Sequence, residues 1–285
     1  ERPGEHAAPF NLILYRRQKA MSLPFSKNRR TYILLTLIIC ALTCSQTFAQ
    51  RRRAPAVGQY AVIVDERLAA LRDAPDLSAR LLQRMSRGRA VAIMGAKRAP
   101  DGVTFYRVAV SSRTRGWLQS EAVVSPARAK DDERLLRLIS ASEGFDRLAR
   151  ARIFLDLFTR SRLRPMVLLL YGEAAEEAAL KLSREAARRL DEREMTASGA
   201  PLFSYFMNYS GLDRFRRQGV VYTFDRTSQR FHYDGASWRE IIRHHPRSPE
   251  AAEARKRLNA LSLRLSFDKS SGKMSGEASA QMTAR

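Results

Sequence analysis

Short apolar runs separated by turn residues fill residues 59–125, and apolar residues at helical spacing follow from about residue 130. Residues 60–64, 90–94 and 105–110 have the length and the β-branched and aromatic content of strands, and a fourth run begins at Gly116. Arg87-Gly88 and Pro100-Asp101-Gly102 supply turn residues between the runs. The pattern predicts several short strands with no long helix, as in a small barrel or sandwich.

A helical region is expected over residues 130–265, beyond Pro126 and a short polar linker. Asp131 and Asp132 suit a helix start, because acidic side chains interact favourably with the free amides there. A second helix is predicted over residues 146–159 from its apolar spacing. A third is expected to begin at Pro165, which is tolerated in a first turn, and to run to about Leu190.

The helical pattern is interrupted after residue 198 by Gly199, Pro201 and Gly211, all of which break helices. Apolar runs at residues 220–224 and 230–233, joined by a polar turn, predict a β-hairpin at about residues 219–234. The alternating rings of this hairpin fit either a ligand groove or a cover over the helical core.

Residues 21–49 have the order of a secretory signal peptide. Basic residues precede an apolar run at residues 32–44, and Thr47-Phe48-Ala49 is a suitable cleavage site. The run is shorter than the roughly 18 residues of a membrane span, which makes an uncleaved anchor the alternative. We expect residues 1–20 to be a mis-assigned start and residues 50–58 to be a basic linker. Both cysteines, Cys40 and Cys44, lie in the leader, so the exported chain would contain no thiol.

The formal charge is +22, from 51 basic and 29 acidic residues. Such an excess favours an anionic partner, which includes nucleic acid, membrane headgroups and acidic polymers. The basic residues are mostly Arg, a bias that a GC-rich coding sequence also produces. Export makes nucleic acid the less expected partner, since an exported protein rarely meets it.

Four ordered submotifs in residues 59–125 resemble bacterial SH3-like domains. Residues 70–79 (ALRDAPDLSA) resemble the family's N-V-R-S-G-P-S-x-S opening, and residues 81–91 resemble its V-I-x-x-L-x-K-G-x-x-V segment. Phe105-Tyr106-Arg107-Val108 stands where the family has W-Y-K-V, and Gly116-Trp117-Leu118 matches its closing G-W-V. The resemblance implies a small all-β barrel.

The resemblance also implies binding, because relatives commonly dock peptidoglycan stem or bridge peptides or act as extracytoplasmic interaction modules. Arg72, Tyr106 and Trp117 are the expected ligand-binding face. The alternative for Tyr106 and Trp117 is packing in the core or at its rim. Ala70 and Phe105 depart from the Asn and Trp that many relatives carry, which weakens the transfer of any particular ligand.

Residues 151–161 align without gaps with residues 238–248, and the second stretch continues as SPEAAEARKRL. This continuation resembles the signature of tetratricopeptide-like repeats, in a form close to that of periplasmic lipoproteins of the outer-membrane β-barrel assembly machinery. The spacing of 87 residues is not a multiple of the usual 34-residue period, so a short, irregular helical array is expected. The residues expected to pack between its helices are Phe154, Phe158, Trp238, Ile241, Ala251 and Ala254.

Catalytic and metal-binding motifs are absent from the sequence, which has no P-loop, dinucleotide motif, HExxH or nucleophile elbow. Ser270-Ser271-Gly272-Lys273 fits an S-x-x-K pattern but lies in residues 266–285, where the composition predicts a disordered tail. His244 and His245 are adjacent on a predicted helix and form a poor chelate. We therefore expect no enzyme activity, no cofactor and no metal.

The sequence thus predicts an α+β multidomain protein, a small SH3-like β-barrel followed by a tetratricopeptide-like helical domain with a hairpin insertion. The expected function is that of an exported bacterial interaction or scaffold protein, periplasmic or extracellular, without a transmembrane span in the mature chain. Its expected partners are an envelope protein or peptidoglycan peptide, or an anionic envelope polymer. The alternatives are an accessory or unrecognised hydrolase of cell-wall remodelling, and a protein that binds anionic lipid or nucleic acid.

Overall fold

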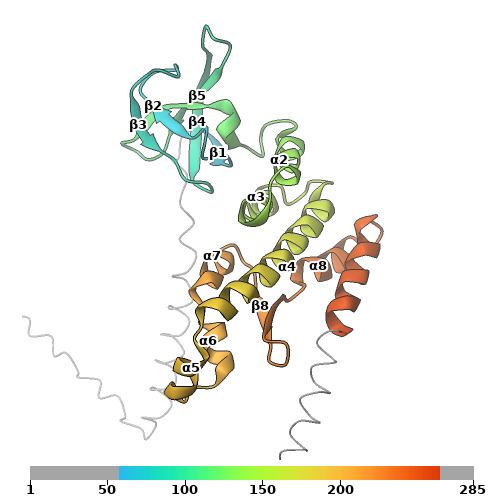
Figure 1. The fold of residues 1–285 in the computed structure, drawn as a ribbon. Helices are drawn as coiled ribbons and strands as arrows, with labels where there is room; N and C mark the ends of the chain where they lie inside the picture. Colours follow the sequence, from blue (N-terminus) through green and yellow to red (C-terminus); the bar gives the residue numbers. More distant parts are fainter. Residues whose placement is uncertain (1–57, 264–285) are drawn as a thin grey trace, which may run out of the picture. The chain divides into compact units, whose positions relative to one another are not determined.

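An antiparallel sheet of seven strands precedes a helical region that contains a two-stranded hairpin (Figure 1). The computed structural model describes residues 58–263. The predicted leader, nearly all of the basic linker and the predicted tail lie outside the described residues. The chain is an α+β protein, as predicted.

The strands of the sheet occur where the apolar runs predicted them, with three additional short strands. In spatial order the sheet is β3-β2-β6-β5-β4-β1-β7. The strands are β1 (Gln59–Ile63), β2 (Ala70–Arg72), β3 (Leu81–Arg84), β4 (Ala90–Arg98), β5 (Thr104–Ala109), β6 (Arg115–Gln119) and β7 (Val123–Val124). A 3₁₀ turn, η1 (Ser120–Ala122), joins the last two.

The sheet is not closed into a barrel, so the prediction of a closed barrel was wrong. Closure requires a continuous ladder of strand pairs, but β3 and β7 stand at opposite ends of the described sheet. Each of these end strands is short, and β3 pairs with β2 across a β-bulge. The β2–β6 pairing rests on one pair of residues, Arg72 and Trp117. Too few paired residues at the ends therefore leave the sheet open.

The two faces of the sheet bury different surfaces. Residues of the inner face form one hydrophobic core, to which Ile63, Leu71 and Leu118 belong. The opposite, outer face at β1 and β7 presents Val62 and Val124, which pack into the hydrophobic core of the helical region. The sheet and the helices consequently share buried surface at this end of the sheet.

The helical region contains one long helix with shorter elements packed on it. Its elements are α2 (Asp131–Ser140), α3 (Gly144–Leu157), α4 (Arg164–Arg189), α5 (Glu192–Ser198), α6 (Leu202–Met207), η2 (Ser210–Leu212), α7 (Asp213–Arg216), β8 (Tyr222–Asp225), β9 (Arg230–Tyr233) and α8 (Ala236–His244). A further helix occupies residues 250–263. Helices α3 and α8 and strand β9 all contact α4, the long helix of Figure 1.

The two aligned stretches begin in helices α3 and α8 and continue past their ends, and both helices use their apolar faces against the same core. The six side chains expected to pack there, namely Phe154, Phe158, Trp238, Ile241, Ala251 and Ala254, are all buried in it. Close approach of α8 to α4 depends on Gly172, since a Cβ at this position would lie 2.3 Å from Nε1 of Trp238.

The hairpin of β8 and β9 covers the helical core. Its rings Tyr222, Phe231 and Tyr233 are buried, and burial raises the pKa of Tyr233 to about 12. Two side chains of α4 hold the hairpin by its backbone: Ser183 Oγ accepts the Phe231 N–H at 2.8 Å, and Glu176 Oε2 accepts the Tyr233 N–H at 2.9 Å. The alternating rings therefore serve the core and do not line a groove.

Candidate functional site

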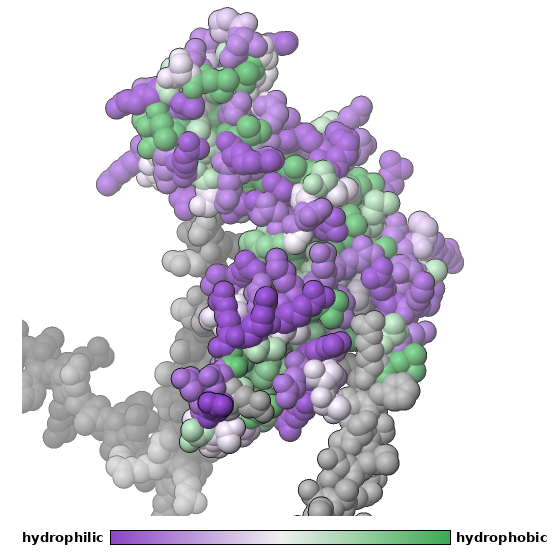
Figure 2. Space-filling view, viewed as in Figure 1, coloured by the Kyte–Doolittle hydropathy of each residue, from purple (hydrophilic) through white to green (hydrophobic). Residues whose placement is uncertain are grey.

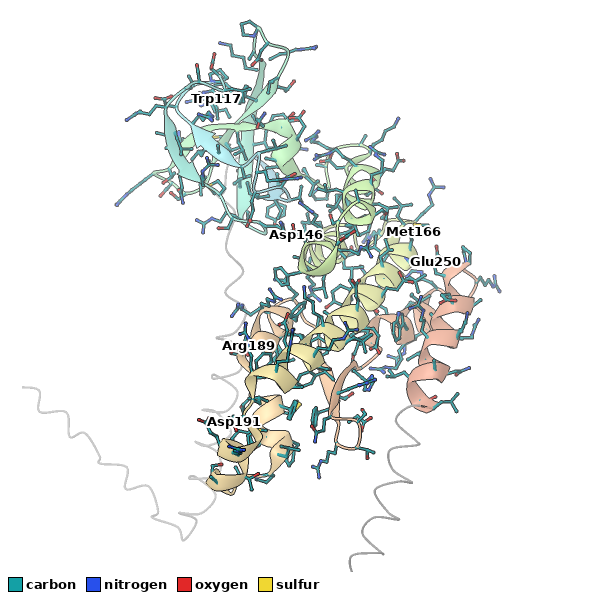
Figure 3. All side chains as sticks on the ribbon, in the orientation of Figure 1. Trp117, Asp146, Met166, Arg189, Asp191 and Glu250 are labelled. Atoms are coloured by element: carbon teal, nitrogen blue, oxygen red, sulfur yellow. The ribbon has the colours of Figure 1, made fainter. Side chains whose placement is uncertain are left out.

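A cation, an indole and a second cation lie in one row across the outer face of the sheet. Arg107 on β5 is the cross-strand partner of Trp117 on β6, which is in turn the partner of Arg72 on β2. Directly paired residues of an antiparallel sheet project to the same face, so the three side chains are neighbours. Trp117, labelled on the sheet in Figure 3, is half-buried, and Arg107 is exposed.

The strands carry cations without carboxylates. The seven strands contain six basic residues, Arg72, Arg84, Lys97, Arg98, Arg107 and Arg115, and no Asp or Glu. None of the six forms an ion pair within residues 58–263. Unneutralised charge on one sheet is the electrostatic basis of an anion-binding surface.

The loop between β2 and β3 orients Arg72 and carries two carboxylates, which have partners within the loop. Arg72 Nη1 donates to the Ala79 carbonyl at 2.6 Å, which restrains the guanidinium beside Trp117. Asp73 pairs with Arg80 at 3.1 Å. Asp76 accepts hydrogen bonds from the backbone and hydroxyl of Ser78, and these hydrogen bonds lower the pKa of its carboxyl.

Tyr106 lies on the opposite face from Trp117. Its cross-strand partner is Leu118, an inner-face residue, and its ring packs against the inner core of the sheet. The Arg128 guanidinium lies 5.1 Å from the centre of that ring. The structure thus brings together two of the three residues expected to bind a ligand, Arg72 and Trp117, and separates the third.

Arg107 is the neighbour of Trp117 that sequence reasoning did not select. The alternation of side chains along β5 predicts that Arg107 and Tyr106 point to opposite faces of the sheet. It does not predict which residue of β6 pairs with Arg107. Beyond Arg107 in the same row is Gly95 of β4, where a Cβ would meet no described atom within 4 Å. The surface next to the Arg107 side chain is consequently open to a ligand.

These groups suit binding of an anion by an extended, open surface. A guanidinium forms paired hydrogen bonds with a carboxylate or phosphate in a planar fork, and an indole offers a flat apolar ring to stack on. An open row of this kind fits a chain-like ligand better than a small molecule, which needs an enclosed pocket.

A groove of about 690 Å³ lies between the sheet and helices α2 and α3. Many of the residues that line it form ion pairs with one another. Arg87 Nη1 is 2.8 Å from Asp146 Oδ1, and the hydrogen bond lowers the pKa of that carboxyl (Asp146 is labelled in Figure 3). Arg150, almost fully buried, donates from Nε to the Val64 carbonyl at 3.1 Å and from Nη1 to the Ser142 hydroxyl. We call Arg87, Asp146 and Arg150, together with the Val64 carbonyl and the Ser142 hydroxyl, the arginine seam. It joins the sheet to the helices.

A second groove, of about 730 Å³, follows the exposed side of α4 next to the start of α3 and α7. Phe145 and Phe215 meet edge to face in it, with ring centres 5.4 Å apart, and the Arg214 guanidinium lies over both rings. Basic and acidic side chains of α4 alternate along the rest of the lining. Because acidic and basic side chains are mixed in its lining, the groove does not favour anionic ligands as the sheet does.

Metal-binding clusters and membrane-spanning helices are both missing from the part of the chain that the structure describes. Within residues 58–263 there is no group of three or more His, Cys, Asp or Glu side chains that could hold a metal ion. None of the described helices combines the length and apolar character needed to cross a bilayer. No protein-family model, curated protein or solved structure matches this chain.

Proposed function

We propose that this protein is an exported bacterial interaction protein, a binding protein rather than an enzyme. Its SH3-like sheet module binds carboxylate-bearing peptides of the cell wall or of an envelope protein, and its tetratricopeptide-like helices recruit a second protein. The observation that carries the proposal is the row of Arg72, Trp117 and Arg107 on a sheet whose strands contain no carboxylate.

The order of the submotifs along the sheet supports the SH3-like part of the proposal. The opening motif includes β2 with Arg72, Gly88 adopts a φ of +76° in the turn before β4, and the closing motif is β6 with Trp117. The tetratricopeptide-like part is supported by α3 and α8, in which the aligned stretches begin and which both pack on α4.

The expected affinity is modest. One exposed ion pair contributes about 0–1 kcal/mol, because water and salt screen it and two long side chains must be ordered. A useful affinity therefore needs both arginines together with stacking on the indole of Trp117. Stem peptides of peptidoglycan carry several free carboxylates, and their repetition on a polymer adds avidity to each weak contact.

Sedimentation of residues 50–285 with purified peptidoglycan sacculi tests the proposal. We expect retention in the pellet at low salt, and release when Arg72→Gln and Arg107→Gln are combined or when Trp117 is changed to Ala. Arg113→Gln is the matched control, because it removes an exposed cation from a loop outside the row. Recovery of the wild-type protein wholly in the supernatant, at low and at high salt, would refute the cell-wall part.

The six unpaired cations also fit phosphate, so anionic lipid or nucleic acid is the second candidate partner. Binding dominated by phosphate weakens steeply with salt. Vesicles with and without phosphatidylglycerol, and a mixed-sequence DNA duplex, titrated at two salt concentrations separate this candidate from peptide binding.

A further inference from the structure

Strand β3 offers a free edge beside the basic row. It is the end strand of the sheet, and within the described part of the chain it pairs only with β2. All four of its residues, Leu81–Arg84, are exposed. An unpaired edge presents backbone N–H and C=O groups that can form hydrogen bonds with another extended chain.

Exposed leucines gather at this edge. Leu77, Leu81 and Leu82 leave 44%, 44% and 41% of their surface in water, and they lie within six consecutive positions of the chain. Figure 2 shows hydrophobic surface among hydrophilic surface over the sheet, in the upper part of the view. Edge strands are usually protected by charge or proline, so an edge with two exposed leucines, and a third in the loop before it, has apolar surface that a partner would cover.

The basic side chains around the edge favour a partner with negative charge. Leu81 is the cross-strand partner of Arg72, which places it at the end of the row that begins with Arg107. Arg84, paired with Ala70, projects to the same outer face and has no ion-pair partner among the described residues. A chain lying along β3 would therefore contact leucine side chains together with guanidinium groups that form no ion pair among the described residues.

We propose that the peptide ligand of this sheet binds as an added strand on β3. The ligand is an extended, acidic segment of another molecule that carries acidic and apolar residues on the same face of its strand, because Leu81, Arg72 and Arg84 share the outer face. Its backbone pairs with the edge, its carboxylates face Arg72 and Arg84, and its apolar side chains cover the leucines. This inference rests on the proposed function, because it specifies how the same sheet holds its peptide.

The dimensions of β3 limit the interaction to a short segment. Four residues at about 3.3 Å each span about 13 Å, and the bulge disturbs the regularity of the edge. Pairing over so few residues supplies few backbone hydrogen bonds, so side-chain contacts must contribute. Both types of contact are therefore necessary, and each can be removed separately.

The test uses a capped octapeptide of sequence EEVVEEVV, measured by isothermal titration against residues 50–285, because this order puts both Glu and Val on each face of an extended strand. Two further peptides carry N-methyl groups on the four odd or on the four even positions, which keeps the charge but removes backbone donors from one edge. We expect at least one of the two to lose about tenfold in affinity. Equal affinity of all three peptides, within about twofold, would overturn strand addition.

Protein variants provide the second arm. Leu82→Gln removes apolar surface from the edge, and Met94→Gln is its control, because Met94 is a similarly exposed residue of β4 at 39%. We expect Leu82→Gln to lower the affinity for the unmodified peptide about threefold or more, and Met94→Gln to leave that affinity unchanged. Equal affinities of the two variants would contradict the inference.

The outcomes distinguish the inference from the proposed function. If sacculi are retained by the basic row but the octapeptide does not bind, strand addition is wrong and the wall-binding function stands. If neither sacculi nor peptide binds, the proposed function itself fails.

Discussion

Replacing Arg150 by Met tests whether the arginine seam holds the sheet on the helices. The guanidinium makes two hydrogen bonds, to the Val64 carbonyl and the Ser142 hydroxyl, each worth about 1.5–3 kcal/mol for a charged donor. Removing a buried charge also relieves its desolvation, which offsets part of this loss. Burial is the largest cause that lowers the pKa of Arg150, followed by the charge of Arg87. We expect Arg150→Met to lower the free energy of unfolding by about 1–3 kcal/mol.

Asp146→Asn is the matched comparison for this prediction. Asp146 lies 3.8 Å from Arg150, and 52% of its side chain is exposed, so solvent screens the pair. We expect this variant to cost less than about 1 kcal/mol. The hydrogen bonds of Arg150 to the sheet and to Ser142, and not its ion pair, then account for most of the stabilisation.

The assay is urea unfolding with one probe for each part of the chain. The sequence contains two tryptophans, Trp117 in the sheet and Trp238 in α8. With Trp238 replaced by Phe, fluorescence follows the sheet, while far-UV circular dichroism follows mainly the helices. We expect the two transitions to coincide in this background and to separate when Arg150→Met is added. A cost for Asp146→Asn as large as that for Arg150→Met would refute the reasoning.

Two other predictions concern the contact between α4 and α8 and the response to acid. Gly172→Ala places a Cβ 2.3 Å from Trp238 Nε1, so we expect a loss of about 1–3 kcal/mol in thermal or urea unfolding. Gly95→Ala, where a Cβ has open space, should change stability by less than about 0.5 kcal/mol. Because Arg87 lowers the pKa of Asp146, this carboxylate contributes stability above the ordinary Asp pKa of about 3.9 and loses it as the pH falls through the lowered pKa. The melting temperature of Asp146→Asn should therefore fall less than that of the wild type between about pH 5 and about pH 2, and an equal fall would contradict the assignment.

Most element positions could be predicted from the sequence because local rules determine them. The pattern predicts a third helix from Pro165 to about Leu190, and α4 occupies Arg164–Arg189. Strands β1, β4, β5 and β6 coincide with the predicted runs, whereas β2, β3 and β7 have two to four residues and were too short for the pattern to reveal. Apolar periodicity is strong in long elements and weak in short ones.

The residues of the candidate site were predictable only in part. Trp117 and Arg72 were selected from the motifs in which they occur, and the structure places them side by side. Tyr106 was selected for the same reason, but the register of β5 against β6 turns it toward the inner core. Register depends on pairing between segments far apart in the chain, so a period of two in each strand cannot determine it.

By itself the sequence determined where the longer strands and helices form, that a hairpin interrupts the helices, and that the chain carries a large basic excess. These properties follow from local periodicity, turn residues and composition. Only the tertiary structure decided that the sheet stays open, that Arg107 joins Trp117 and Arg72, and that Arg150 reaches the Val64 carbonyl from α3. Each of these depends on contacts between residues distant in sequence, whose geometry arises only when the pairing and packing of the whole chain are satisfied together.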